Sequence, residues 1–282
     1  MEDPIPAEVR RDRIASLVAE REFVRVQELS ELFDLSEVTI RTDLGLLAER
    51  GLVERVHGGA MAADREPKVE RTFEEALGEH AAEKAAIGRH AAQMVRTGGT
   101  VILDVGTTTT AIARALVTRE DLTDATVFTT GLTNALELEA AIPRLSVVVT
   151  GGTLRPKQHS LVEPMAHHLL DQVHASVAFI GCNGVHPERG ITNVNLPEAT
   201  VKRRMVEAAT KTVVVADGSK LGHISVAKIA DLSQVDLLIT GPSASPEVVA
   251  ELVGRGLAVE VAEPDPYTEA SAPAPAPTGG NT

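Results

Sequence analysis

The stretch LDVGTTTT, which starts at residue 103, combines residue types that suit anion binding. An apolar run ends at Asp104, and Gly106 lets the backbone turn tightly where a side chain would block an approaching ligand. Thr107, Thr108 and Thr109 then open an expected helix, whose free amides and positive dipole end favour an anion. No lysine follows in the spacing of a nucleotide-binding P-loop. The loop is predicted to bind a phosphate group, although such threonines also commonly just cap a helix.

Alternating strands and helices are predicted to carry this loop. Runs of β-branched residues predict strands over 100–104, 125–130, 146–150, 175–180, 212–216, 235–240 and 257–261. Amphipathic segments predict helices over 81–97, 108–117, 133–141, 163–172, 197–210 and 246–254. This alternation indicates an α/β domain with a mostly parallel sheet covered by helices.

Four further polar or glycine-rich segments follow other expected strands: TTGLTN, TGGTLRPKQHS, GCNGV and ADGSKLGH. Ligands of open parallel sheets bind outside the carboxyl ends of the strands, so the five loops are expected to converge on one edge. His167 and His168 are neighbours in a predicted helix and point to different sides, so we expect no metal site there.

The first 62 residues differ in pattern from this domain. Helices are expected over about 7–20, around Val26 to Phe33, and over 37–50, where Ser36 is a suitable N-cap. In the third helix we expect an inward face of Val38, Leu44 and Leu47, with Ile40 at its flank. Its outer face is expected to comprise Glu37, Thr39, Arg41, Thr42 and Asp43. A strand and hairpin end follow over 52–59, which completes the outline of a winged helix-turn-helix with its motif at about 24–43.

This outline predicts a DNA-reading surface. Thr39, Arg41 and Thr42 have side chains suited to base edges in the major groove, and Ser36 is suited to a phosphate. Arg55 and His57, in the expected wing, are suited to gripping the DNA backbone. Residues 1–62 hold 8 basic and 13 acidic residues, which instead favours a small helical dimerisation domain with a solvated charged face.

Composition sets the limits of these predictions. The 282 residues suggest two domains, and 43% hydrophobic residues without Trp suit a sheet packed from aliphatic side chains. The net charge of −13 argues against indiscriminate binding to nucleic acids or anionic membranes. One cysteine, Cys182, and the lack of a leader or a long apolar run are consistent with the cytoplasm.

We expect a linker at 63–79, the α/β domain at 80–262, and a disordered Pro/Ala-rich tail at 263–282.

The segment LFDLSEVTIRTDLGLLAERGLVERVHGGA resembles the DNA-binding domain of the DeoR family of bacterial transcriptional regulators. In that family the recognition helix typically reads Ser-x-x-Thr-Ile-Arg-Arg-Asp-Leu and the wing ends in His-Gly-Gly-Ala. The positions that match are Ser36, Thr39, Ile40, Arg41, Asp43, Leu44, His57, Gly58, Gly59 and Ala60. Thr42 departs from the pattern, because an arginine is usual there, which removes a cation from near the DNA.

The resemblance continues to about residue 240 through the loops quoted above and the segments VAFIGCNGV and EATVKRRM. It implies a sensor domain that is similar in fold to sugar-phosphate isomerases and deaminases and that binds a phosphorylated sugar. It also implies a repressor of carbohydrate metabolism genes, a homo-oligomer (dimer or tetramer) on paired DNA half-sites, and no cofactor. The effector site is expected to comprise Asp104, Gly106, Thr107, Thr108, Thr109, Thr130, Gly152, Lys202, Asp217 and Lys220.

Individual roles follow from that resemblance. Lys202 and Lys220 would supply cations to the phosphate, and Asp104 and Asp217 would accept hydrogen bonds from sugar hydroxyls. Thr130 stands where the family often has asparagine. Two alternatives stay open: a sugar-phosphate isomerase or deaminase with Asp104 and Asp217 as its acid/base pair, and an adaptor with vestigial loops. No dedicated set of proton-transfer residues is evident, with His223 the nearest candidate, so a sensor is preferred to an enzyme.

Overall fold

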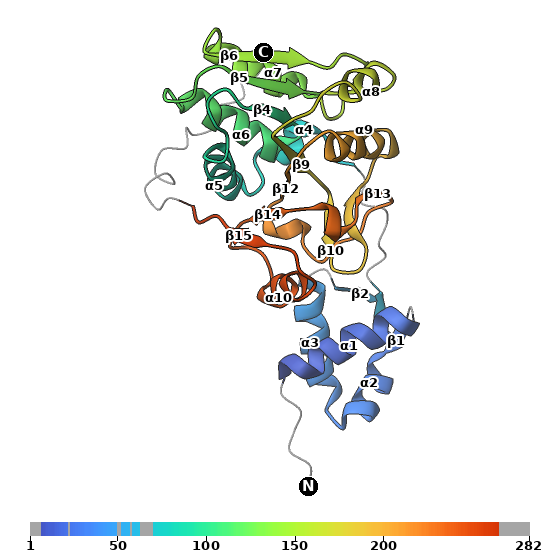
Figure 1. Ribbon diagram of the computed structural model, residues 1–282. Helices are drawn as coiled ribbons and strands as arrows, with labels where there is room; N and C mark the ends of the chain where they lie inside the picture. Colours follow the sequence, from blue (N-terminus) through green and yellow to red (C-terminus); the bar gives the residue numbers. More distant parts are fainter. Residues whose placement is uncertain (1–6, 22, 50–51, 57, 63–69, 265–282) are drawn as a thin grey trace, which may run out of the picture. The chain divides into compact units, whose positions relative to one another are not determined.

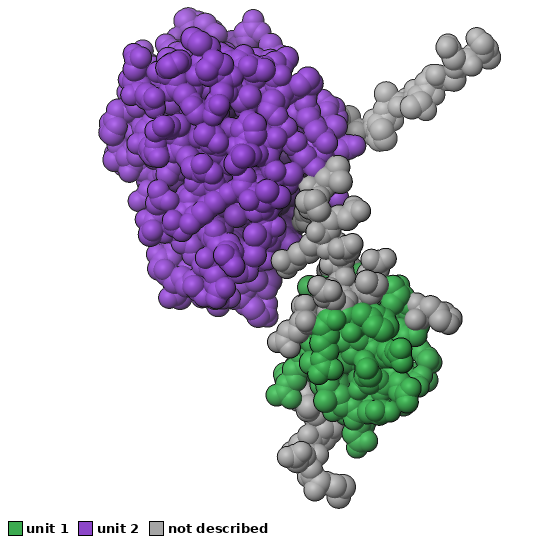
Figure 2. Space-filling model, turned by 90° about the vertical axis from the view of Figure 1, so that its right-hand side faces the viewer, with its two compact units in different colours: residues 1–68 green, residues 69–282 purple. Residues whose placement is uncertain are grey.

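The protein is described from a computed structural model, which covers residues 7–264 apart from 22, 50–51, 57 and 63–69. It divides into two compact units, residues 1–68 and residues 69–282, shown in Figure 2 in green and purple. Each is considered by itself below. His57, residues 63–69 of the expected linker and residues 265–282 of the expected tail lie outside the described residues.

Unit 1 contains three helices and three short strands among its described residues (Figure 1). The helices are α1 (Ala7–Arg21), α2 (Val26–Phe33) and α3 (Glu37–Glu49), and the strands are β1 (Phe23–Arg25), β2 (Val53–Val56) and β3 (Gly59–Ala62). The strands form an antiparallel sheet in the order β1-β3-β2. Strand β1 was not predicted, but the expected order of three helices followed by a hairpin is confirmed.

The face of α3 that packs inward differs from the prediction. Ile40 is fully buried together with Leu44 and Leu47, whereas Val38 is 70% exposed. Asp43, expected on the outer face, is only 3% exposed. Each residue turns an α-helix by about 100°, so positions 40, 43, 44 and 47 share one face while position 38 lies about 120° from position 44. The predicted orientations of Val38 and Asp43 are therefore wrong.

The turn between α2 and α3 forms as its residues suggest. Asp34 adopts the left-handed conformation (φ 50°) at the end of α2, where short polar side chains are tolerated. The amide of Thr39 donates to Ser36 Oγ at 3.2 Å, so Ser36 acts as the N-cap that the sequence predicts. This cap fixes where the recognition helix begins.

Unit 2 is built on a seven-stranded parallel sheet with the order β15-β14-β12-β9-β4-β5-β6. Each of these strands overlaps a predicted segment, with β6 beginning one residue before its segment and β9 ending one residue after: β4 (Thr100–Leu103), β5 (Ala125–Thr129), β6 (Leu145–Val149), β9 (Val177–Gly181), β12 (Thr212–Val215), β14 (Leu237–Thr240) and β15 (Val259–Val261). The prediction of a mostly parallel sheet is confirmed.

Helices cover both faces of this sheet (Figure 1). One face packs against α5 (Ala81–Ala92), α6 (Thr107–Thr118) and α7 (Leu132–Leu138), and the other against α8 (Met165–Leu170), α9 (Leu196–Glu207) and α10 (Pro246–Gly254). Successive strand residues alternate between the two cores: Val101 and Leu103 face the first layer, and Ile102 faces the second. In the described part of the chain, no helix is long and apolar enough to cross a membrane.

Several short elements were not predicted. They are the hairpin β7 (Thr153–Arg155) and β8 (Ser160–Val162), and a small antiparallel sheet of β10 (Gly184–His186), β11 (Gly190–Asn193) and β13 (Ala227–Ala230). Helix α4 (Phe73–Leu77) lies within the expected linker 63–79, and its Phe73 is buried. The described secondary structure of unit 2 thus begins before residue 80. The remaining elements are three short 3-10 helices, Glu139–Ala141, Gly218–Lys220 and Leu232–Gln234.

Candidate functional site

The outer face of α3 carries the residues predicted to read DNA. Arg41 and Thr42 are exposed, and Thr39 is half-buried beside its cap. The guanidinium of Arg41 forms an ion pair with Glu37 one turn earlier, with Nη2 and Oε2 2.6 Å apart. The hydroxyl of Thr42 donates to the carbonyl of Val38 at 3.0 Å. Ser36, Arg41 and Thr42 are therefore all exposed, with Arg41 held by an acidic neighbour.

Arg55 extends this surface from strand β2. It is exposed, and a Cβ added to Gly45 of α3 would lie 3.8 Å from its Nη1, so the guanidinium lies over the helix. Among the predicted DNA-contacting residues, only His57 is outside the described part of the chain.

A buried ion pair holds α3 against α1. The carboxylate of Asp43 is 2.7 Å from Nε of Arg10 and 3.5 Å from Nη1 of Arg11. A carboxylate in this environment is tolerated because two cations surround it. The acidic residue of the recognition-helix motif thus positions the helix and does not face outward.

The effector site was predicted at one edge of the sheet, and the strand order identifies the point of reversal along that edge. From β4 the chain continues through β5 and β6 on one side, whereas β9, β12, β14 and β15 follow on the other. The order therefore reverses between β4 and β9, where open parallel sheets bind their ligands. The LDVGTTTT loop follows β4, and GCNGV includes the end of β9.

The four threonines of the loop divide into two pairs. Thr109 and Thr110 are fully buried, and both hydroxyls donate to the carbonyl of Gly106 at 2.9 Å. In the described structure the hydroxyls of Thr107 and Thr108 make no hydrogen bond, and no side chain caps the start of α6. Gly106 has a φ of +133°, which a residue with a Cβ rarely adopts. The hydroxyls of Thr109 and Thr110 thus shape the loop, whereas those of Thr107 and Thr108 do not, and Thr108 is only 9% exposed.

Asn134 lies near the start of α7, the helix after the neighbouring strand β5, and it holds this loop in place. Its amide nitrogen donates to the carbonyl of Asp104 at 2.7 Å, and its carbonyl oxygen accepts from the Thr110 hydroxyl at 2.7 Å. Asn134 is buried, so these bonds replace hydration that it has lost. The free amides of α6 are held in place before any ligand binds.

Asp104 and Lys202 contact each other. They form a buried ion pair, and the ammonium also donates to the carbonyl of Gly181 at 3.0 Å. The amide of Gly181 donates to the same carboxylate oxygen of Asp104 at 2.9 Å. Although burial opposes the charge, Asp104 and Glu198 raise the pKa of Lys202 above its ordinary value. Both side chains are almost completely buried, so this pair ties the ends of β4 and β9 together beneath the loop.

Asp217 and Lys220 lie at the end of β12, the strand next to β9. Asp217 caps a short 3-10 helix by accepting from the Ser219 amide at 3.2 Å. Lys220 follows in that helix and is half-buried. Val215 of β12 pairs with Gly181 of β9, whose carbonyl accepts from Lys202, so Asp217 and Lys220 follow the strand beside the Asp104–Lys202 pair.

Sequence reasoning missed Lys84 of α5. It is 5% exposed, and its ammonium donates to the carbonyl of Ala76 at 2.7 Å. Burial lowers the pKa of Lys84, the charge of Lys220 lowers it further, and Asp217 opposes the shift. The sequence does indicate that Lys84 is buried, because position 84 shares a helix face with Ile87 and Ala91, which are buried. A cation on that face is unfavourable unless a ligand or carboxylate offsets it.

Glu83, the neighbour of Lys84, joins α5 to the same edge. It accepts from the amide of Gly218 at 2.9 Å and from the hydroxyl of Ser243 at 2.8–2.9 Å. A Cβ on Gly241 would lie 2.0 Å from the Glu83 side chain, so only glycine fits there. Glu83 therefore acts as a structural anchor for the loop that carries Asp217 and Lys220.

Two further residues of the predicted effector site, Thr130 and Gly152, lie against strand β8. Thr130 is buried, and its carbonyl accepts from the amide of Leu161 at 2.8 Å. Gly152 has a φ of +128°, and a Cβ there would lie 1.9 Å from the carbonyl oxygen of Val162. Close backbone approach at Gly152 is thus to strand β8. Of the groups suited to an anion, Gly106, Thr107 and Thr108 follow β4, Lys220 follows β12, and Lys84 lies on α5.

Arg155 links this edge to the beginning of unit 2. Its guanidinium pairs with Glu198 of α9, one turn before Lys202, and with Glu70 at 2.7 Å. The carbonyl of Lys157 accepts from the Phe73 amide at 2.8 Å, so the hairpin β7–β8 also binds the start of α4. These contacts thus join Glu70 to α9, the helix that carries Lys202.

Cys182 lies next to the end of β9, and its thiol is not activated as a nucleophile. Loss of hydration raises the pKa of the Cys182 thiol to about 12, although Lys202 and Lys220 lower it, so the thiolate is disfavoured. Among the described residues, no group of three or more His, Cys, Asp or Glu side chains could hold a metal ion.

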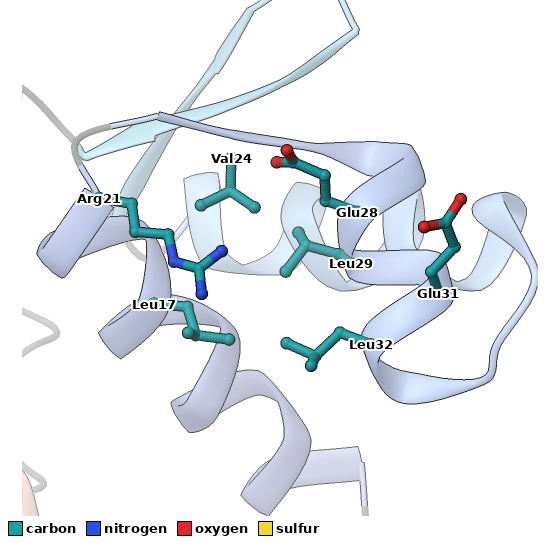
Figure 3. A pocket seen from close by; sticks show the side chains of 7 residues that line it. All are labelled: Leu17, Arg21, Val24, Glu28, Leu29, Glu31 and Leu32. Atoms are coloured by element: carbon teal, nitrogen blue, oxygen red, sulfur yellow. The ribbon is translucent and has the colours of Figure 1, made fainter.

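A pocket of about 350 Å³ is found in unit 1, between α1 and α2 (Figure 3). It is lined by Leu17, Arg21, Val24, Glu28, Leu29, Glu31 and Leu32. None of these residues is on α3, and the polar groups shown in Figure 3 are two carboxylates and one guanidinium. The pocket therefore does not coincide with either predicted site.

Comparisons with known proteins agree with both halves of this description. A model of the DeoR C-terminal sensor domain matches residues 79–242, and a model of the DeoR-like helix-turn-helix domain matches residues 10–66. A ribose 5-phosphate isomerase from Methanocaldococcus jannaschii covers 50% of this chain and 55% of its own, with 20% identity and a TM-score of 0.37. A structural likeness this weak supports no conclusion about function.

Relatives along most of the chain are transcriptional regulators. The HTH-type transcriptional regulator GolR of Listeria innocua is 34% identical, over 90% of this chain and 98% of its own. The regulator GlpR of Haloferax volcanii is 36% identical, over 90% and 97%. The repressor CsqR of Escherichia coli is 30% identical, over 82% and 86%. The chain belongs to the DeoR family of transcriptional regulators.

Proposed function

We propose that this protein represses carbohydrate metabolism genes and that a phosphorylated sugar, bound at the edge where β4 and β9 end, lowers its affinity for operator DNA. The observation that carries the proposal is the uncapped start of α6, where the hydroxyls of Thr107 and Thr108 are unbonded. Helix amides without a cap, held in place by Asn134, are suited to a phosphate.

Charge at the edge supports an anionic ligand. Lys84 is buried although burial disfavours its charge, and Lys220 adds a second cation nearby. A bound phosphate would offset the unfavourable proximity of these two cations. The carboxylate of Asp217, which is also close to Lys84, is suited to accepting a hydrogen bond from a sugar hydroxyl.

Arg155 offers a route by which ligand binding would reach the DNA-binding unit. It contacts Glu70, the first described residue after 63–69, and Glu198, which lies one turn from Lys202. A ligand that shifts the loop next to the Asp104–Lys202 pair would change how Arg155 holds the segment that begins at Glu70. Arg155→Lys is expected to retain DNA binding and ligand binding but to weaken the effect of one on the other.

Symmetric assembly is part of the proposal. Repressors with a recognition helix commonly bind two half-sites that are related by a two-fold axis, which requires at least a dimer. We therefore propose that the protein is a homo-oligomer when it binds its operator, and sedimentation of the protein with and without duplex DNA would measure this.

Ligand binding is tested by thermal unfolding of the full-length protein with a panel of sugars, each with and without its phosphate. A ligand at 100 times its Kd stabilises the folded state by about 2.7 kcal/mol. The double variant Thr107→Val, Thr108→Val is expected to lose this response, because both free hydroxyls are removed. Thr118→Val is the matched control, since its hydroxyl binds Ala115 at the far end of α6. An undiminished response in the double variant would overturn the proposed site.

The enzyme alternative gains no support from the geometry. The carboxylate of Asp104 is paired with Lys202, and that of Asp217 accepts hydrogen bonds from Ser219. Turnover of glucosamine, ribose or fructose phosphates by the purified protein would revive that alternative.

A further inference from the structure

The recognition helix has an apolar side chain where its neighbours are polar. Val38 is the second residue of α3 and is 70% exposed, while the core of unit 1 takes Ile40, Leu44 and Leu47 from the same helix. A single exposed valine is usually unimportant. Its position is informative here, because the first residues of a recognition helix are those that contact base edges.

The polar side chains around Val38 already have partners. Arg41 is paired with Glu37, and the hydroxyl of Thr42 donates to the Val38 carbonyl. The hydroxyls of Ser36 and Thr39 are hydrogen-bonded to each other at 2.9 Å. In the first turn of α3, Val38 therefore contributes an apolar surface with no packing role inside unit 1.

The major groove offers one apolar group that suits this surface. Thymine carries a C5 methyl group, whereas cytosine presents only a hydrogen atom there and a donor amine beside it. An isopropyl group cannot accept from that amine, so approach to cytosine would desolvate a donor without replacing its hydrogen bond. Contact with thymine buries two apolar groups and leaves no polar group unpaired.

We propose that Val38 contacts the C5 methyl group of a thymine in the operator, and so selects thymine over cytosine at one position of each half-site. The proposal rests on DNA reading by α3, and it assigns base discrimination to a residue that the sequence pattern alone had placed in the core. Burial of one methyl-sized group predicts about a fourfold preference.

The test uses full-length protein and a duplex selected from a random pool. Each thymine of the selected site is replaced in turn by deoxyuridine, which keeps its pairing hydrogen bonds and lacks only the methyl group. For the unchanged protein, one replacement in each half-site is expected to raise Kd about fourfold. Val38→Ala is expected to bind the thymine and uracil duplexes equally and to accept cytosine there in a repeated selection.

A thermodynamic cycle of protein and DNA changes separates local coupling from independent effects, because groups that are far apart and share no partners give additive losses. Val9→Ala is the matched control, since Val9 is also exposed but belongs to α1. Alanine has a higher helix propensity than valine, so the variant at 38 is expected to fold, which circular dichroism checks. The proposal is overturned if every thymine tolerates uracil, or if Val38→Ala leaves the uracil penalty unchanged.

A different result is expected if the protein does not bind DNA in a sequence-specific way. If no sequence is enriched from the random pool, α3 does not read bases at all, which contradicts both the proposed operator binding and the role of Val38. Enrichment without methyl coupling overturns only the role of Val38.

Discussion

Thr42→Arg tests whether the outer face of α3 contacts DNA. Thr42 is exposed, and its hydroxyl is bonded only to the carbonyl one turn earlier. The residues three and four positions away are Val38, Thr39, Gly45 and Leu46, and none of them is acidic. An arginine side chain introduced at 42 would thus have no carboxylate on its own helix face to pair with, so its charge stays available for a phosphate.

The expected magnitude follows from counterion release. One additional phosphate contact makes the slope of log K against log salt steeper by about 0.9. Between 50 and 200 mM KCl, the loss of affinity is therefore expected to be about 3.5 times larger for the variant than for the unchanged protein. Fluorescence anisotropy with a labelled duplex of fixed length at several salt concentrations measures both slopes.

A matched variant separates local contact from a general change in charge. Thr200, on α9 of unit 2, also donates its hydroxyl to the carbonyl four residues earlier, at 3.0 Å. Thr200→Arg adds the same charge and is expected to leave the slope unchanged. If both variants steepen the slope equally, or if neither does, the assignment of the α3 face to DNA is refuted.

Three further changes give distinct results. Glu37→Gln releases Arg41 and removes a negative charge from the DNA face, so tighter duplex binding is expected by anisotropy, and weaker binding would contradict it. Asp43→Asn breaks the buried pair with the two arginines of α1 and is expected to cost unit 1 about 3 kcal/mol, seen in calorimetry as a lower first transition with the second unmoved. Lys84→Met concerns pH: because the pKa of Lys84 is lowered in the folded state, the unfolded state binds more protons between that pKa and about 10.5, so stability rises with pH over this window. Urea unfolding across the window should show the rise in the unchanged protein and a smaller rise in the variant.

The parallel sheet was predictable because its strands are buried on both faces. Continuous runs such as TVIL and TVVV have no polar alternation, and each occurs between helical segments. The short antiparallel strands β7, β8, β10, β11 and β13 have only three or four residues. They read TLR, SLV, GVH, GITN and AKIA, so none has more than two successive β-branched or leucine residues, whereas the equally short TVIL and TVVV have four.

The orientation of α3 was mispredicted because residue type was weighted above helix phase. Val38 was placed inward as an apolar residue, although six positions separate it from Leu44. Asp43 was placed outward as an acid, although it lies three positions from Ile40 and four from Leu47. Its burial depends on Arg10 and Arg11 of another helix, more than 30 residues away, which a local pattern does not contain.

The position of the loop after β4 was predicted from sequence, but the division of its threonines was not. That Thr109 and Thr110 bond the carbonyl of Gly106 depends on the local backbone, which a run of four identical residues does not specify. Likewise, Lys202 and Asp104 are 98 positions apart, and their pairing arises only because β9 lies beside β4. Contacts between distant segments thus decided which polar groups remain free.

We propose that a phosphorylated sugar bound at this edge weakens DNA binding. The direct test measures Kd for the selected duplex with and without each phosphorylated sugar that stabilises the protein against heat. Coupling of this kind usually changes affinity by about 5- to 150-fold, so at least a fivefold rise in Kd is expected, and none in the Thr107→Val, Thr108→Val variant. A phosphorylated sugar that binds the protein and leaves Kd for the duplex unchanged would contradict the account.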